Sequence, residues 1–179
     1  MADAPPASVL QGEVVVRRAA HDDFARVGQL TFAAYLTDGF VETGNPYGAQ
    51  LQDTAARAAD AEVWVAEIED PSGSSSLVVG SVTWCPVGSS WREVARDDEG
   101  EFRMLAVDPS GRRRGVARRL VEQCIELARE ADLAGVALSS MPTQTSAHQL
   151  YLSLGFHRDP ADDWTPVPGV DLWGFRLRF

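Results

Sequence analysis

Short apolar segments bounded by turn-forming residues recur along the chain, and they predict strands. The predicted strands cover residues 13–18, 62–67, 77–84, 101–107, 135–140 and 172–179. Two of these segments flank the run PSGSSS, whose residues favour a tight turn. The pattern therefore predicts that residues 62–67 and 77–84 form a hairpin.

Apolar residues at helical spacing predict four helices, over residues 21–35, 50–61, 115–132 and 145–154. The third has the clearest amphipathic stripe, and Gly155 ends the fourth. Because strands outnumber helices and some are joined as hairpins, we expect an α/β fold. It has a mixed, mostly antiparallel central sheet with flanking helices. Residues 1–12 are predicted to be disordered, and residues 13–179 to form one domain.

Composition and charge exclude several classes of protein. The formal net charge is -10, which argues against a nucleic-acid partner. No apolar run can span a bilayer, and the N-terminus lacks the features of a secretory signal, so we expect no membrane partner and a cytoplasmic location. Cys85 and Cys124 are expected to be free thiols, and no spacing of Cys and His indicates a metal site.

The stretch SGRRRGVARRL places five arginines between Arg112 and Arg119, around Gly115, where a strand gives way to a helix. The first turn of a helix leaves N–H groups unpaired, and its dipole favours an anion. Glycine lets a ligand approach the backbone, and arginine matches phosphate oxygens. The stretch is therefore either a phosphate-binding loop or a solvated, arginine-rich helix start in a chain without lysine.

The wider neighbourhood, MLAVDPSGRRRGVARRLVE, resembles the central motif of the GCN5-related N-acetyltransferase (GNAT) superfamily. A second match follows, Gln144-x-x-Ala147-x-x-x-Tyr151-x-x-x-Gly155-Phe156, in which the family usually has Asn at the first position. This resemblance implies an acetyl-CoA-dependent N-acetyltransferase, with backbone N–H groups from Arg113 to Ala117 holding the pyrophosphate. It assigns the coenzyme A site to Leu105, Ala106, Val107, Arg112, Arg113, Arg114, Gly115, Val116, Ala117, Arg118, Gln144, Ala147 and Tyr151.

Acyl transfer to an amine needs a base, an oxyanion donor and a proton for the thiolate. The resemblance implies that Glu101 is the base, that Tyr151 is the acid and that the Leu105 N–H is the oxyanion donor. The alternative bases are Asp97, Asp98 and Glu99. Glu101 can equally be an exposed strand-end charge, and Tyr151 a core aromatic residue. Cys124 is expected to be packing, and His148 and His157 to be inert surface residues.

The acceptor is a small-molecule or peptide amine of unknown identity. In the family its pocket usually involves the first helices and the loop before the last strand. Here the candidates are Phe32, Tyr35, Phe40, Tyr47 and residues 161–169, with either Trp91 or Trp164 as a further wall and Asp38, Asp162 and Asp163 as carboxylates for a cation. Dimers are common among relatives, and residues 172–179 could pair across such an interface.

Three other functions stay open at this point. An enzyme with the same fold could transfer a longer acyl group or use a hydroxyl acceptor. The chain could be a coenzyme A-binding regulatory module without turnover. It could also be an arginine-rich interaction protein that binds no coenzyme A at all.

Overall fold

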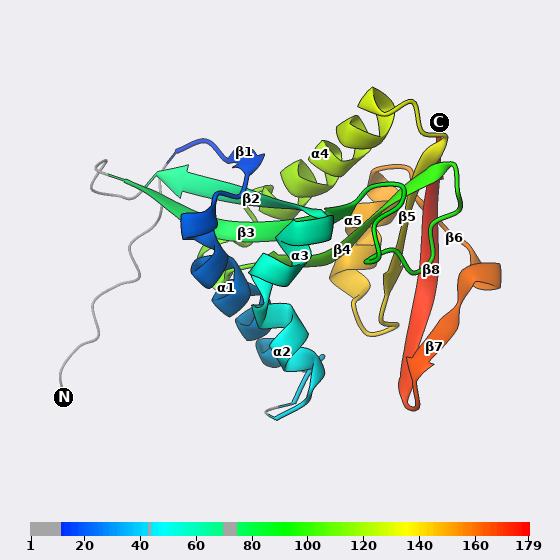
Figure 1. The fold of residues 1–179 in the computed structure, drawn as a ribbon, viewed down its shortest axis with the longest axis horizontal. Coiled ribbons are helices and arrows are strands. Elements are labelled where there is room, and N and C mark those ends of the chain that lie inside the picture. The colour runs from blue at the N-terminus through cyan, green and yellow to red at the C-terminus, as the bar shows by residue number, and fades with distance from the viewer. Residues whose placement is uncertain (1–11, 43, 70–74) are drawn as a thin grey trace.

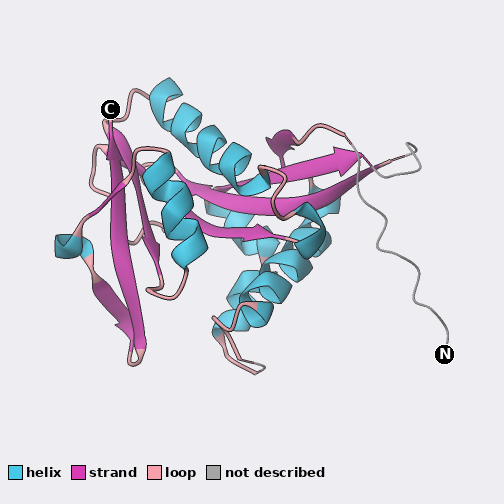
Figure 2. Cartoon of the chain, turned by 180° about the vertical axis from the view of Figure 1, so that it is seen from behind, coloured by secondary structure: helices cyan, strands magenta, loops and turns pink. Residues whose placement is uncertain are grey.

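A computed structural model describes residues 12–42, 44–69 and 75–179 of the chain (Figure 1). Residues 1–11 of the segment predicted to be disordered lie outside this part. One sheet forms the centre, with helices on both of its faces (Figures 1 and 2). None of the helices in the described ranges is long and apolar enough to cross a bilayer.

The sheet has eight strands in the described residues, and neighbours pair in the order β1-β2-β3-β4-β5-β8-β6, with β7 on β8. Every pairing is antiparallel except that of β4 with β5. The α/β fold with a mixed, mostly antiparallel sheet is therefore confirmed, as is the hairpin of β2 and β3. The strands are β1 (Val15–Arg18), β2 (Glu62–Glu69), β3 (Ser76–Cys85), β4 (Glu99–Val107), β5 (Gly135–Ser140), β6 (His157–Arg158), β7 (Trp164–Val167) and β8 (Val170–Arg178).

The helices of the described residues are α1 (Phe24–Thr37), α2 (Tyr47–Gln52), α3 (Thr54–Asp60), α4 (Val116–Glu130) and α5 (Thr145–Ser153). The single helix predicted over residues 50–61 is wrong, because Asp53 divides it into α2 and α3. The Asp53 backbone is not helical, and its carboxylate accepts a bond of 2.9 Å from the Ala56 N–H. This is the ordinary chemistry of a helix N-cap, which starts a new helix.

Each face of the sheet is covered by a different set of helices (Figure 1). The apolar stripe of α4 packs on one face, where Leu120 and Cys124 are fully buried beside Val82. Helix α1 packs on the other face, through Val27 and Leu30. Each of these leucine and valine side chains stabilises the fold by roughly 1.5–3 kcal/mol when it is fully buried. The two layers fix the ends of α1 and α4 near the same end of β4.

The sheet opens between β4 and β5. These strands pair only from Glu99 to Glu101, and the rest of β4 has no strand on that side in the described structure. Figure 1 shows the two halves of the sheet running at a steep angle to each other. In β4, Met104 and Leu105 together lie opposite Val82, and Met104 has a φ of 54°, which marks a bulge. The opening that the coenzyme A hypothesis requires is therefore present.

The segment before the last strand is more regular than predicted. Residues 161–169 are not simply a loop, because they contain β7, which turns at Gly169 and pairs with β8. Gly169 has a φ of 86°, which suits the turn. Pro166 interrupts the alternation that would have predicted this strand from the sequence.

Candidate active site

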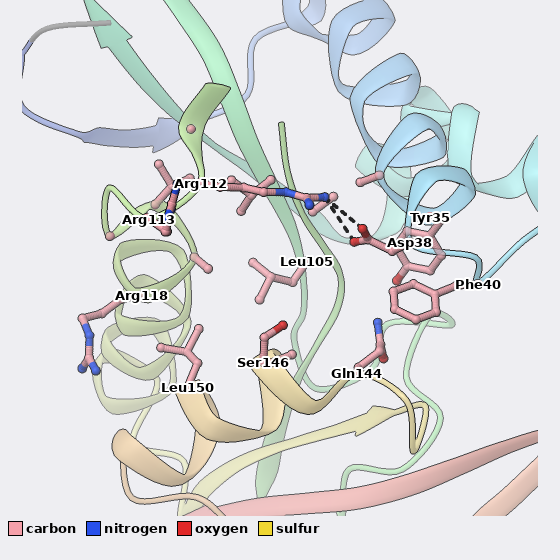
Figure 3. A pocket seen from close by; sticks show the side chains of 18 of the residues that line it. Tyr35, Asp38, Phe40, Leu105, Arg112, Arg113, Arg118, Gln144, Ser146 and Leu150 are labelled. Carbon is pink, nitrogen blue, oxygen red and sulfur yellow. Dashed lines mark hydrogen bonds and ion pairs between the residues drawn. The ribbon is translucent and has the colours of Figure 1, made fainter. Parts of the chain in front are cut away.

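A cavity of about 730 Å³ lies at the opening of the sheet (Figure 3). Its walls come from the end of α1, the end of β4, the start of α4 and the first turns of α5. It gathers most of the residues predicted to bind coenzyme A: Leu105, Ala106, Val107, Arg112, Arg113, Gly115, Val116, Ala117, Arg118, Gln144 and Ala147. Arg114 and Tyr151 are the two predicted residues that do not line it.

The start of α4 forms one wall and has the features of an anion site. Gly115 is the N-cap, with a φ of 80°, and no side chain caps the helix. Arg113 also has a positive φ, of 58°. A Cβ atom added at Gly115 would meet nothing within 4 Å, so the backbone is open to a ligand. Successive N–H groups at an uncapped helix start fit the oxygens of a pyrophosphate.

The arginines of this loop point in different directions. The Arg112 guanidinium lies across the cavity and pairs with Asp38 at 3.0 Å (Figure 3). Arg118 donates to the Ser153 hydroxyl at 2.8 Å, and Arg114 donates to the Gly12 carbonyl at 3.1 Å. Arg112 and Arg118 are therefore already bound to protein groups, and a phosphate would compete with those partners.

The edge of β4 supplies backbone groups to the cavity. The Asp108 N–H donates to the Val79 carbonyl on β3 at 2.8 Å. Because successive residues of a strand point their N–H groups to opposite sides, the Val107 N–H faces the opening. Leu105, the second residue of the bulge, lines the same opening. These groups can pair with the amides of a pantetheine arm as a neighbouring strand would.

Gln144 lies where the family usually has Asn, and its orientation is fixed. Its Oε1 accepts bonds from the Ser140 hydroxyl at 2.7 Å and from the Met141 N–H at 2.8 Å. With that oxygen occupied, the amide nitrogen is the free end, and Figure 3 shows it directed toward Phe40. Gln144 therefore presents a hydrogen-bond donor to the cavity.

A second cavity, of about 540 Å³, adjoins the first. The two share Tyr35, Phe40 and Gln144, so a molecule in one can reach the other. Among the predicted acceptor residues, Tyr35, Phe40 and Tyr47 line the second cavity, as do Pro166 and Val167 of the segment 161–169. Phe32, Trp91 and Trp164 do not line it.

The three carboxylates proposed for a cationic acceptor are already paired. Asp38 binds Arg112, while Asp162 and Asp163 bind Arg176 and Arg158. Hydrogen bonding to the Arg176 guanidinium holds the pKa of Asp162 below its usual value. None of the three faces the second cavity.

Glu101, the predicted base, is fully buried on β4. Its Oε2 accepts three backbone N–H bonds of 2.8–3.0 Å, from Glu93, Val94 and Ala95. It lines neither cavity, so its carboxylate fixes the preceding loop in this structure. The alternatives Asp98 and Glu99 are bound by arginines of β8.

Tyr151, the predicted acid, is a residue of α5 whose side chain lies in the core, with 5% of its surface exposed. Its ring contacts Phe102, Phe156 and Phe175. Burial raises the pKa of its phenol, which keeps it protonated at neutral pH. No hydrogen bond is made by its hydroxyl within the described residues. Its roles as acid and as core aromatic residue are both compatible with this position.

Three further residues have definite places. Cys124 is buried in the core, as predicted. Burial raises the pKa of the Cys85 thiol to about 12. The surface position predicted for His148 is wrong. It is buried because its ring stacks on Trp173 and its Nε2 bonds Ser140 at 3.1 Å.

Residues 30–156 match the model of the Acetyltransferase (GNAT) family. Two curated relatives illustrate the range. Mycothiol acetyltransferase of Nocardia farcinica (strain IFM 10152) is 31% identical over 85% of this chain and 48% of its own length. N-acetylaspartate synthetase of Rattus norvegicus is 33% identical over 42% of this chain and 25% of its own length. The matches cover only about a quarter of the first such relatives.

Solved structures share the fold. A GNAT-family acetyltransferase from Staphylococcus aureus Mu50 superposes with a TM-score of 0.69 at 12% identity, covering 92% of this chain and 98% of the other. The protein yncA from Salmonella typhimurium, solved with its cofactor acetyl-CoA, superposes with a TM-score of 0.63 at 21% identity, covering 93% and 94%.

Proposed function

The chain belongs to the acetyltransferase (GNAT) family, and we propose that it transfers an acetyl group from acetyl-CoA to a primary amine. The observation that carries this proposal is the first cavity. There, the uncapped start of α4 and the unpaired edge of β4 meet, and a second cavity opens beside them. A nucleotide-linked thioester and an amine could therefore be held together, as direct attack in a ternary complex requires.

The residues of the chain divide the work. Backbone N–H groups from Arg113 to Ala117 bind the pyrophosphate, and the edge of β4 orients the pantetheine arm. Acetyl-CoA supplies the acyl group when bound. The Leu105 N–H stabilises the developing negative charge on the acyl oxygen, and the Tyr151 phenol gives a proton to the departing thiolate.

The base at Glu101 stays a prediction. The Glu101 carboxylate is bound to the N–H groups of residues 93–95, on the loop before β4. A substitution of Glu101 would therefore affect the second cavity through the position of this loop. Cytoplasmic location and a homodimer likewise stay proposals.

Titration calorimetry with acetyl-CoA, followed by thiol release with a panel of primary amines, tests the proposal. We expect binding, and release that one class of amine accelerates. Absence of binding would overturn the coenzyme A site. If acetyl-CoA binds and no primary amine accelerates thiol release, the non-catalytic module is favoured. If thiol is released with alcohols as acceptors or with longer acyl donors, the other acyltransferase functions are favoured.

A further inference from the structure

Glu93, on the loop between β3 and β4, is a carboxylate in the second cavity that the sequence patterns do not single out. Its Oε1 pairs with the Arg103 Nη2 at 2.7 Å. Its Oε2 has no hydrogen-bond partner in the described part of the chain. About a quarter of the side chain, 27%, is exposed. One carboxylate oxygen is therefore available to a ligand.

The loop that carries Glu93 is held from two sides. The Glu101 Oε2 accepts the Glu93 N–H at 2.9 Å and also binds the next two N–H groups. The Arg103 Nη1 donates to the Trp91 carbonyl at 2.9 Å, and Arg176 donates to the Val94 carbonyl at 2.8 Å. Glu93 is thus preorganised, which distinguishes it from an exposed acidic residue on a mobile loop.

The surroundings of Glu93 are mostly apolar. The same cavity is lined by the rings of Tyr35, Phe40 and Tyr47 and by the side chains of Met104 and Leu172. Its volume of about 540 Å³ suits a small organic molecule. A ligand that satisfies both the carboxylate and these walls carries a cation on an aromatic or branched aliphatic body.

We infer that Glu93 binds the ammonium group of the acceptor, and that the acceptor is a small primary amine with an apolar body. This inference rests on the proposed acetyl transfer and names its substrate class. The ammonium lies against Oε2, while the body contacts the aromatic walls. The second cavity adjoins the cofactor cavity at Tyr35 and Phe40. The amine nitrogen therefore reaches the thioester through this shared boundary.

Glu93, in place of Glu101, also takes the proton that must leave before attack. An N–H bond of the ammonium breaks, an O–H bond forms on Oε2, and the freed lone pair of nitrogen attacks the acyl carbon. The C–S bond then breaks, the thiolate leaves with the Tyr151 proton, and the second proton lost by the nitrogen restores the Tyr151 phenol. The charged and titratable groups around Glu93 are Cys85 from β3, Arg103 and Glu101 from β4, and Tyr47 from α2. Arg103 is shared with the Trp91 carbonyl and the Tyr47 hydroxyl, and burial opposes the charged carboxylate.

The test compares a cation with its neutral isostere. Phenethylamine and phenethyl alcohol are titrated into the full chain saturated with coenzyme A, at neutral pH. We expect the wild type to bind the amine about 10- to 100-fold more tightly than the alcohol, as one hydrogen bond to a charged group allows. Glu93→Gln should reduce this preference to about twofold or less while leaving the affinity for the alcohol unchanged.

Two variants control the test. Glu42→Gln removes an exposed charge next in sequence to Val41 of the cavity wall, and it should keep the preference. Glu101→Gln distinguishes the two carboxylates. If Glu101→Gln abolishes the preference and Glu93→Gln does not, the inference is overturned. Equal affinity of the wild type for amine and alcohol would overturn it too.

Turnover supplies a second readout. In acetyl transfer to phenethylamine, Glu93→Gln should remove the acidic limb of the pH profile of kcat/KM. Efficient acetylation of only polar amines, with normal coenzyme A binding, would overturn the inference and leave the proposed function intact. Failure to bind acetyl-CoA would instead remove the proposed function.

Discussion

The two cavities at the opening of the sheet are built in different ways. The anion-binding wall of the first is made of backbone groups from two neighbouring segments, the end of β4 and the start of α4, while α1 and α5 supply the other walls. The second is made of side chains from α1, α2, β4 and the loop before it, β5, and the β7–β8 hairpin. The first can be specified by a short motif, since glycine and a helix start suffice. The second depends on the whole fold.

This difference indicates which of the two cavities tolerates amino-acid substitutions. A backbone site is lost through the few substitutions that block the backbone. A side-chain site can be altered one wall at a time while the fold is kept. On the proposed function, the first cavity therefore suits a constant ligand, and the second suits the choice of acceptor.

The largest expected effect is at Gly115. Gly115→Asp should weaken coenzyme A binding by more than about 100-fold in calorimetry, because it places a carboxylate against phosphate and blocks several charge-assisted hydrogen bonds. Gly88→Asp is the matched control. Gly88 also has a positive φ and open space around its Cβ position, but it lies outside both cavities. Equal loss in both variants would mean that backbone strain, and not the anion site, is responsible.

Tyr151→Phe should lower kcat by about 100-fold, because the thiolate then leaves without its proton. No protein hydrogen bond of the described structure is lost, so the melting temperature and the Kd for coenzyme A should barely change. Stopped-flow kinetics with saturating acetyl-CoA checks the rate. Undiminished turnover would mean that Tyr151 is only a core aromatic residue and not the acid.

Asp38→Asn should strengthen coenzyme A binding by about two- to fivefold. The Arg112–Asp38 pair is partly exposed and worth less than about 1 kcal/mol, and its loss frees Arg112 for phosphate. Calorimetry at low and at moderate salt checks the effect, which should shrink as salt rises. Weaker binding by this variant would show that Asp38 itself helps the cofactor.

The smallest effect is the pH dependence of stability that Glu93 contributes. Burial raises its pKa in the folded state, despite Arg103. Between the pKa of Glu93 in the unfolded chain and its higher pKa in the folded chain, the folded chain binds more protons. The contribution of Glu93 to the free energy of unfolding is therefore complete below the unfolded-state pKa. It declines as the pH rises through the folded-state pKa. The free energy of unfolding in urea, relative to Glu93→Gln, should fall from pH 4 to pH 7. A rise would contradict the sign.

The sequence was most informative where structure is local. The α4 stripe and the Gly115 loop follow from residues close together in the chain, and both were predicted. The break at Asp53 and the strand containing Pro166 were missed, because a cap and a short edge strand leave weak periodic signals. Glu93 was missed for another reason: only the fold brings it into one cavity with Tyr35 and Met104.

The opening between β4 and β5 also makes the stability of the folded chain depend on the concentration of a ligand. A ligand that fills it completes the sheet, so mass action should stabilise the folded chain in proportion to the logarithm of ligand excess over Kd. At 100 times Kd the gain is about 2.7 kcal/mol. With the proposed cofactor, a protease should therefore cleave the chain more slowly when acetyl-CoA is added.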